Sequence, residues 1–168
     1  MNFILNGTAC SGKDLFVQIV SDYLSEQTPP IQVKNISSVD NIKKAAELLG
    51  WDGVKNEKGR KFLSDLKDIS TALYDAPMKY MESYLTPHWN KCVKFFHIRE
   101  PFEITKFVTK YPATKTILIK RKNVVEYDNH ADAKVEDYDY DYIIYNYGTL
   151  EEYKEIVEKF CEERICLK

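Results

Sequence analysis

The sequence predicts an α/β fold, with a parallel sheet of about five strands and helices on both faces. Short apolar runs alternate along the chain with longer segments whose apolar residues recur at helical spacing, in the order β-α-β-α-α-α-β-α-β-loop-β-α. The apolar, β-branched run Thr116–Ile119 is typical of a strand that is buried on both faces. Right-handed crossovers between such strands give a parallel sheet. Five strands occupy all 168 residues, so we expect a single domain with insertions at strand ends.

The first half of the chain is expected to supply two strands and four helices. These are a strand Phe3–Asn6, a helix from about Gly12 to Ser25, a strand from Ile31 to Ile36, and helices over 40–50, Phe62–Leu73 and Asp75–Pro87. Thr28-Pro29-Pro30 ends the first helix. We interpret Asn56–Gly59 as a loop, and Asp75 and Pro77 as the N-cap and first-turn proline of the fourth helix.

The second half supplies three strands and two helices. Strands are expected over Val93–Ile98, Thr116–Ile119 and Asp141–Tyr145, with one helix from Pro101 and another after a capping box of Thr149 and Glu152. A polar stretch from Lys120 to about Asp139, with Asn129, His130 and Asp132, separates the last two strands. A loop of this length favours a lid, and an ordinary solvated loop is the alternative.

Composition excludes several classes of protein. Lys and Arg number 24 against 26 Asp and Glu, a net charge of −2, which disfavours a nucleic-acid-binding protein. No apolar run approaches the roughly 18–20 residues of a membrane helix, and the N-terminus has no signal-peptide pattern. The four cysteines, Cys10, Cys92, Cys161 and Cys166, have no CxxC or zinc-ligand spacing. We therefore expect free thiols and a cytoplasmic protein.

One motif carries most of the chemical information. The residues Gly7, Thr8, Ala9, Cys10, Ser11, Gly12 and Lys13 fit the pattern GxxxxGK between a predicted strand and a predicted helix. Such a loop turns backbone N–H groups toward phosphate oxygens at a helix N-terminus, and its lysine reaches the β- and γ-phosphates. The alternative is a glycine-rich turn that binds nothing.

The next residue, Asp14, stands where the usual motif has a Ser or Thr that binds Mg²⁺ through its hydroxyl. A carboxylate can also hold Mg²⁺, directly or through water. The alternative is an acidic residue that only favours the helix dipole.

Two of the four arginines follow predicted strands, Arg99 after one and Arg121 after the next. Ligands of open α/β sheets bind outside the carboxyl ends of the strands, and the forked guanidinium group suits phosphate. Glu100 adjoins Arg99 and is a candidate for positioning metal-bound water or substrate. Arg60 and Lys61, after a glycine-containing loop, are predicted to line the acceptor side. In each case the alternative is an ordinary solvated side chain.

These segments together resemble the phage-type deoxynucleoside monophosphate kinases of the P-loop NMP-kinase superfamily. The resemblance rests on NGTACSGKD, WDGVKNEKGRKFLSDLKD, FHIREPFEI, TILIKR and DYDYIIYNYGTLEE, which cover most of the chain. It implies a P-loop kinase fold in one domain, 1–168, with an NMP-binding insertion at roughly 38–90 and a short lid at roughly 121–139.

The resemblance also implies roles for individual residues. Gly7–Asp14 would hold the ATP phosphates, Arg99 the acceptor phosphate, and Arg121 would be the lid arginine. The loop Asn146–Thr149, with Gly148, would lie near the adenine. Where NMP kinases often carry an Asp after the third strand, this chain has Arg99 and Glu100.

The leading hypothesis is Mg²⁺- and ATP-dependent phosphoryl transfer to a (deoxy)nucleoside monophosphate, which gives the diphosphate and ADP. The catalytic residues would be Lys13, Arg99 and Arg121, and the metal would be held by Asp14 and Glu100. One alternative is a P-loop kinase for another small phosphorylated metabolite, of the dephospho-CoA or phosphomevalonate type. Another is a nucleotide-binding module without turnover. The expected partners are a nucleoside triphosphate and a small phosphorylated acceptor, with no nucleic acid and no membrane, in a monomer or homodimer.

Overall fold

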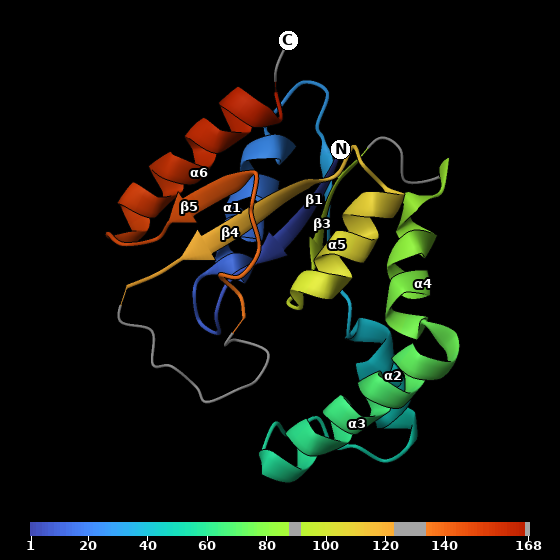
Figure 1. Cartoon of the computed structure of the whole chain (residues 1–168). Helices are drawn as coiled ribbons and strands as arrows, with labels where there is room; N and C mark the ends of the chain where they lie inside the picture. Colours follow the sequence, from blue (N-terminus) through green and yellow to red (C-terminus); the bar gives the residue numbers. More distant parts are fainter. Residues whose placement is uncertain (88–91, 123–133, 167–168) are drawn as a thin grey trace. The chain divides into compact units, whose positions relative to one another are not determined.

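The computed structural model describes residues 1–87, 92–122 and 134–166 (Figure 1). The strands are β1 (Asn2–Asn6), β2 (Gln32–Ser37), β3 (Cys92–His97), β4 (Lys115–Lys120) and β5 (Tyr142–Tyr145). The helices are α1 (Lys13–Ser25), α2 (Asp40–Leu48), α3 (Glu57–Tyr74), α4 (Ala76–Glu82), α5 (Pro101–Lys110) and α6 (Leu150–Arg164), with a short 3₁₀ helix η1 (Ser83–Leu85). This is the predicted order of elements.

The five strands form one sheet in the order β2-β3-β1-β4-β5. β1 lies at the centre and pairs in parallel with β3 and β4, and β4 pairs in parallel with β5. The predicted α/β fold with a five-stranded parallel sheet is confirmed. Because the strands run in one direction, their carboxyl ends meet at one edge: Leu5 lies opposite His97, and Asn6 lies opposite Leu118.

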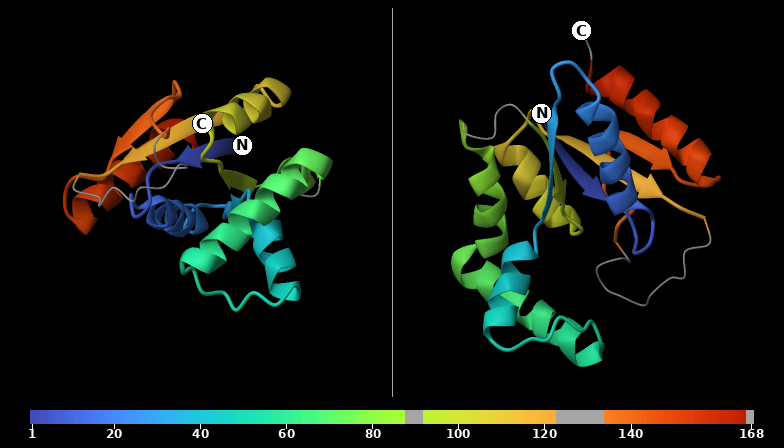
Figure 2. Two further views of the ribbon diagram at one scale, coloured as in Figure 1. Left: turned by 60° about the horizontal axis from the view of Figure 1, so that its bottom comes forward. Right: turned by 180° about the vertical axis from the view of Figure 1, so that it is seen from behind.

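Alternation along the strands sends side chains to two covered faces. Phe3 and Leu5 face a core that α1 and α6 complete, where the ring of Phe16 packs edge-on against Phe95. On the other face, Phe96 of β3 packs against Phe107 of α5, with 5.0 Å between ring centroids. Figure 2 shows α1 and α6 on one side of the sheet and α5 on the other. Both faces are therefore buried, as the apolar strand sequences predict.

The chain divides into two compact units, Met1–Asn35 with Lys91–Lys168, and Ile36–Asn90. The first unit holds most of the sheet with α1, α5 and α6. The second holds α2, α3 and α4, and the side chain of Asn41 donates to the carbonyl of Ala76 at 3.1 Å, which ties α2 to α4. None of the helices in the described part of the chain is both long and apolar enough to cross a membrane.

Two details of the second unit differ from the prediction. The interpretation of Asn56–Gly59 as a loop is wrong for its last three residues, because α3 begins at Glu57. Asn56 is the N-cap, and its side-chain oxygen accepts from the amide of Gly59 at 2.8 Å. Asp75 does precede α4, with Pro77 in the first turn, but it makes no side-chain cap bond. Its backbone is left-handed, with φ 52°, because the same residue also ends α3.

Candidate functional site

The candidate site is the loop between β1 and α1, at the carboxyl edge of the sheet. Gly12 is the N-cap of α1, and the first bond of the helix runs from the amide of Phe16 to the carbonyl of Gly12 at 2.8 Å. The amides of Asp14 and Leu15 therefore have no acceptor within the helix. Together with the positive end of the helix dipole, amides at this position attract anions.

Lys13 places its ammonium group inside this loop. Nζ donates to the carbonyls of Gly7 and Thr8 at 2.6 Å each, and to the hydroxyl of Ser11 at 3.4 Å. The lysine of the GxxxxGK motif is thus held where the loop curves around it. Its charge lies among backbone groups at the end of a central strand.

The loop packs tightly on its neighbours at both glycines of the motif. A Cβ built on Gly7 would lie 2.6 Å from the carbonyl oxygen of Ile119 in β4. Gly12 has φ +99°, and a Cβ there would lie 2.5 Å from Nδ2 of Asn146. Side chains at these two positions would meet neighbouring atoms at distances that Cβ atoms do not tolerate, so the motif glycines serve close approach as well as the turn.

Asn146 and Tyr153 hold the loop from the side of β5 and α6. Asn146 is 7% exposed, and its Nδ2 donates to the carbonyl of Ser11 at 3.0 Å. Its backbone amide donates to the carbonyl of Lys120 at 2.7 Å. The hydroxyl of Tyr153 donates to the carbonyl of Gly12 at 3.4 Å. Burial raises the pKa of Tyr153 above its usual value, so the hydroxyl keeps the proton it donates.

Asn146 has a role that the sequence does not indicate, because its side-chain amide donates to the backbone of the loop Gly7–Gly12. The predicted capping box of Thr149 and Glu152, which begins α6, is confirmed. Gly148 lies exposed between Asn146 and Thr149. That the loop Asn146–Thr149 lies beside an adenine stays a prediction.

Arg121 lies beside the loop, and its role as a lid arginine stays a prediction. Its Nη1 donates to the carbonyl of Cys10 at 3.4 Å, and its side chain is otherwise exposed. Cys10 is itself exposed and has a left-handed backbone, with φ 59°. Of the predicted lid at roughly 121–139, residues 123–133, with Asn129, His130 and Asp132, lie outside the described residues.

Arg99 and Glu100 come after β3 on the same edge of the sheet, and Glu100 is the N-cap of α5. The side chain of Asn6, the last residue of β1, joins this segment to the loop Gly7–Gly12. Its Nδ2 donates to the carbonyl of Arg99 at 3.0 Å, and its Oδ1 accepts from the amide of Gly7 at 2.8 Å. The structure therefore brings Lys13, Arg99 and Arg121 to the carboxyl edge of one sheet.

Arg60 and Lys61 belong to the second unit and are described within it. Nε of Arg60 donates to the carbonyl of Lys55 at 2.9 Å, and Lys61 forms an ion pair with Asp65 at 2.8 Å. Both side chains are exposed. Their contact with an acceptor stays a prediction.

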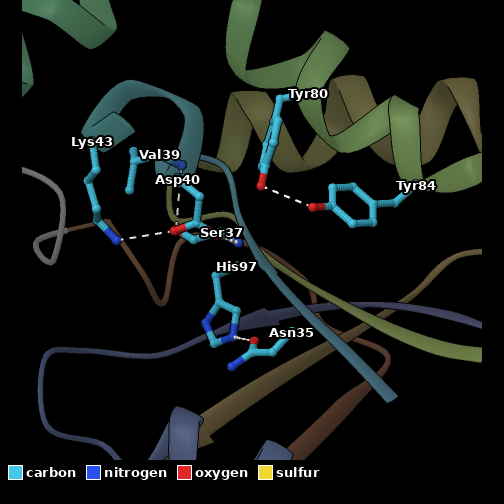
Figure 3. Close-up of polar contacts among 8 residues, drawn as sticks. All are labelled: Asn35, Ser37, Val39, Asp40, Lys43, Tyr80, Tyr84 and His97. Atoms are coloured by element: carbon cyan, nitrogen blue, oxygen red, sulfur yellow. Dashed lines mark hydrogen bonds and ion pairs between the residues drawn. The ribbon is translucent and has the colours of Figure 1, made fainter. Parts of the chain in front are cut away.

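A further polar pair lies at the carboxyl ends of β2 and β3 (Figure 3). His97 and Asn35 are joined by a short hydrogen bond between Nε2 and Oδ1. Because an amide oxygen only accepts, Nε2 carries the hydrogen.

Within the second unit, the same view shows the carboxylate of Asp40, which accepts from the amide of Ser37 at 2.8 Å and pairs with Lys43 at 3.2 Å.

Asn6, Tyr153 and the His97–Asn35 pair were not predicted to belong to the site. The available signal was weak: Asn6 is a polar residue at the end of an apolar strand, directly before a glycine, and His97 stands two residues before Arg99. For metal binding, the described part of the chain holds no group of three or more His, Cys, Asp or Glu residues.

Comparison with known proteins bears on the fold. No family model matches the sequence, and no curated protein matches it. Among solved structures, the chain is similar to a "putative kinase" from Chloroflexus aurantiacus J-10-fl, with TM-score 0.54 and 11% identity over 98% of this chain and 97% of that one. It is also similar to dephospho-CoA kinase from Campylobacter jejuni, with TM-score 0.49 and 15% identity over 96% of each chain. At such identities the likeness concerns the fold alone, and the α/β fold predicted from the sequence is the one observed.

Proposed function

We propose that this protein is an ATP-dependent phosphotransferase that acts on a small phosphorylated acceptor. The observation that carries the proposal is the loop Gly7–Gly12, which begins α1 and encloses the ammonium group of Lys13. The fold shared with the Chloroflexus "putative kinase" is compatible with this reading. A glycine-rich turn without a ligand needs neither a lysine directed into the loop nor an arginine on its rim.

The positive charges of Lys13 and Arg121 indicate how phosphoryl transfer would proceed. The ATP phosphates would lie against the amides at the start of α1, and Lys13 would exchange its loop carbonyls for the β- and γ-phosphate oxygens. An oxygen of the acceptor phosphate forms a bond to the γ-phosphorus in line, and the bond from that phosphorus to the β–γ bridging oxygen breaks, releasing ADP. Such transfer depends on positioning and charge neutralisation and needs no general base. Arg121 would stabilise the migrating group.

The residues fit a magnesium ion that is held mainly by water and nucleotide. Asp14 offers an exposed carboxylate in the first turn of α1, and Glu100 stands at the start of α5. Mg²⁺ usually takes one or two protein carboxylates and fills its remaining positions with water and phosphate oxygens, so no larger cluster is required. When bound, the ion would neutralise charge on the β- and γ-phosphates.

For the acceptor we propose a (deoxy)nucleoside monophosphate, on the strength of the sequence resemblance. Arg99 would hold its phosphate at the carboxyl end of β3, a place next to the P-loop that the bond from Asn6 to the Arg99 carbonyl supports.

The test is ADP release from ATP in the presence of a panel of acceptors. The panel contains the ribo- and deoxyribonucleoside monophosphates, dephospho-CoA and phosphomevalonate. Release with a nucleoside monophosphate supports the proposal, and release only with another compound overturns the proposed acceptor. Binding of ATP without transfer to any acceptor overturns the phosphotransferase.

A pair of lysine variants tests the loop itself. Lys13→Ala should lower turnover by about 100-fold or more, since it removes a charge from the reacting phosphates, with little change in thermal stability. Lys159→Ala removes a lysine from the exposed face of α6, whose side chain is 74% exposed, and is the matched control. Turnover near the wild-type value in Lys13→Ala would exclude this loop as the phosphate site.

A further inference from the structure

A buried side-chain amide connects three segments around the candidate site. Asn6 is 0% exposed. Its Oδ1 accepts from Gly7, and its Nδ2 donates both to the carbonyl of Arg99 at 3.0 Å and to the hydroxyl of Tyr140 at 2.7 Å. An amide nitrogen carries two hydrogens, so both have acceptors. The orientation of the amide is also determined, because the reversed group would direct its oxygen at the carbonyl of Arg99.

Tyr140 completes this set of bonds. Its hydroxyl accepts from Asn6 and donates to the carbonyl of Val135 at 2.8 Å. Burial raises the pKa of Tyr140 to about 12, so the hydroxyl retains the proton that it donates. If the hydroxyl is removed, one hydrogen of the Asn6 amide loses its acceptor, and the amide is held by two bonds instead of three.

The segment that carries Tyr140 is itself fixed to the sheet. It includes the last residues of the predicted lid at roughly 121–139, among them Val135, which is 1% exposed. Glu136 pairs with Lys120, the last residue of β4, at 2.8 Å. The ion pair connects the segment that carries Tyr140 to the carboxyl end of β4.

We propose that Tyr140 is a positioning residue, which acts through the amide of Asn6 to hold Arg99 and Gly7 in place for phosphoryl transfer. The proposal rests on the proposed function in one respect: the group that Arg99 orients is taken to be the acceptor phosphate. It assigns a task to Tyr140 and Asn6, neither of which touches the reacting atoms.

The structure offers a matched pair of variants. Tyr140→Phe removes a hydroxyl that donates one hydrogen bond and accepts another. Thr116→Val does the same at the opposite edge of the sheet, where the buried hydroxyl of Thr116 donates to Oδ2 of Asp141 and accepts from its amide, both at 2.9 Å. Because the Thr116 hydroxyl donates to a carboxylate, Thr116→Val should lose at least as much thermal stability as Tyr140→Phe, so a kinetic effect found only in Tyr140→Phe cannot result from lost stability.

We expect Tyr140→Phe to raise KM for the acceptor and lower kcat, with a combined loss of about 3- to 10-fold, the size of one hydrogen bond. ATP affinity should change little, because the P-loop keeps its bonds to Asn146 and Tyr153. Thr116→Val should leave all three constants unchanged. Equal kinetic effects in the two variants, or none in either, would overturn the proposal.

A second measurement does not depend on turnover. Hydrogen exchange of the Gly7 amide and the carbonyl ¹³C shift of Arg99 report the two bonds that Asn6 makes beside Tyr140. Both should change in Tyr140→Phe and stay constant in Thr116→Val; unchanged values in Tyr140→Phe refute the positioning role even in an active enzyme. If the wild type transfers no phosphate, the proposed function fails, and these two signals alone decide whether Tyr140 holds Arg99 and Gly7.

Discussion

Gly12→Ala is expected to be one of the most damaging small substitutions in the loop Gly7–Gly12. The backbone there has φ +99°, a conformation that residues with a Cβ rarely adopt. The added carbon would also lie 2.5 Å from Nδ2 of Asn146 and 3.7 Å from Cε1 of Tyr153. The side-chain amide of Asn146 would have to move away from the carbonyl of Ser11, to which its Nδ2 now donates.

The stability lost in Gly12→Ala has two parts, backbone strain and displacement of a neighbouring side chain. The backbone strain of a non-glycine residue at such a φ is about 1–3 kcal/mol. Displacing the buried amide adds about 1–3 kcal/mol for crowding and loss of its hydrogen bond. Gly50 provides the control, because it has φ +94° but no heavy atom of the described residues lies within 4 Å of a Cβ built there. Gly50→Ala should therefore show the strain alone.

The assay is the free energy of unfolding by urea, together with the dissociation constant for ATP. Gly12→Ala should lose about 1–3 kcal/mol more than Gly50→Ala, and it should also bind ATP more weakly. In the double variant with Asn146→Ala, the obstructing amide is gone, so the loss should be smaller than the sum of the two single losses. Equal destabilisation of Gly12→Ala and Gly50→Ala, or strict additivity in the double variant, would refute the argument from packing.

Three further outcomes are expected. Arg121→Lys keeps the charge but not the forked donor, so kcat should fall by about 10- to 1,000-fold while the dissociation constant for ATP changes less than about 3-fold; an unchanged kcat would mean a surface role. Iodoacetamide should label the exposed thiol of Cys10 and be slowed by ATP, whereas Cys161 should stay unlabelled until unfolding, because burial raises its pKa to about 12. Although burial opposes it, hydrogen bonds from Lys115 and Thr116 lower the pKa of Asp141 below its usual value. The Asp141 carboxylate should therefore contribute fully to the free energy of unfolding at neutral pH, and this contribution should disappear as the pH falls through the lowered pKa. The free energies of unfolding of wild type and Asp141→Asn should then converge in acid.

The order of elements could be predicted because strands and helices differ in apolar period along the chain itself. β4 is an example, where the uninterrupted run Thr116–Ile119 indicates burial on two faces. The start of α3 could not be read in this way. Its first turn holds Glu57, Lys58 and Gly59, which show no apolar period, and the helix begins there because the side chain of Asn56 satisfies the amide of Gly59.

The candidate site likewise has one part that the sequence predicts and one part that it does not. The GxxxxGK motif is contiguous, so its place between β1 and α1 follows from the sequence. The bond from Asn6 to Tyr140 joins residues 134 positions apart, and the bond from Asn146 to Ser11 spans 135 positions. No local pattern reports such a pairing, since it depends on which strands become neighbours in the sheet.

The chemistry of these two buried positions nevertheless explains why both are asparagine. Asn6 must accept from one backbone amide and donate to two oxygens, and Asn146 must donate to a carbonyl in a space bounded by Gly12. A serine has one hydrogen to donate, and an aspartate in its charged form has none and would be costly to bury. At Asn6, only a small neutral amide accepts one hydrogen bond and donates two. The shape of the loop Gly7–Gly12 therefore depends on two side chains outside the motif: Asn6, directly before the loop on β1, and Asn146, which follows β5 on the far side of β4.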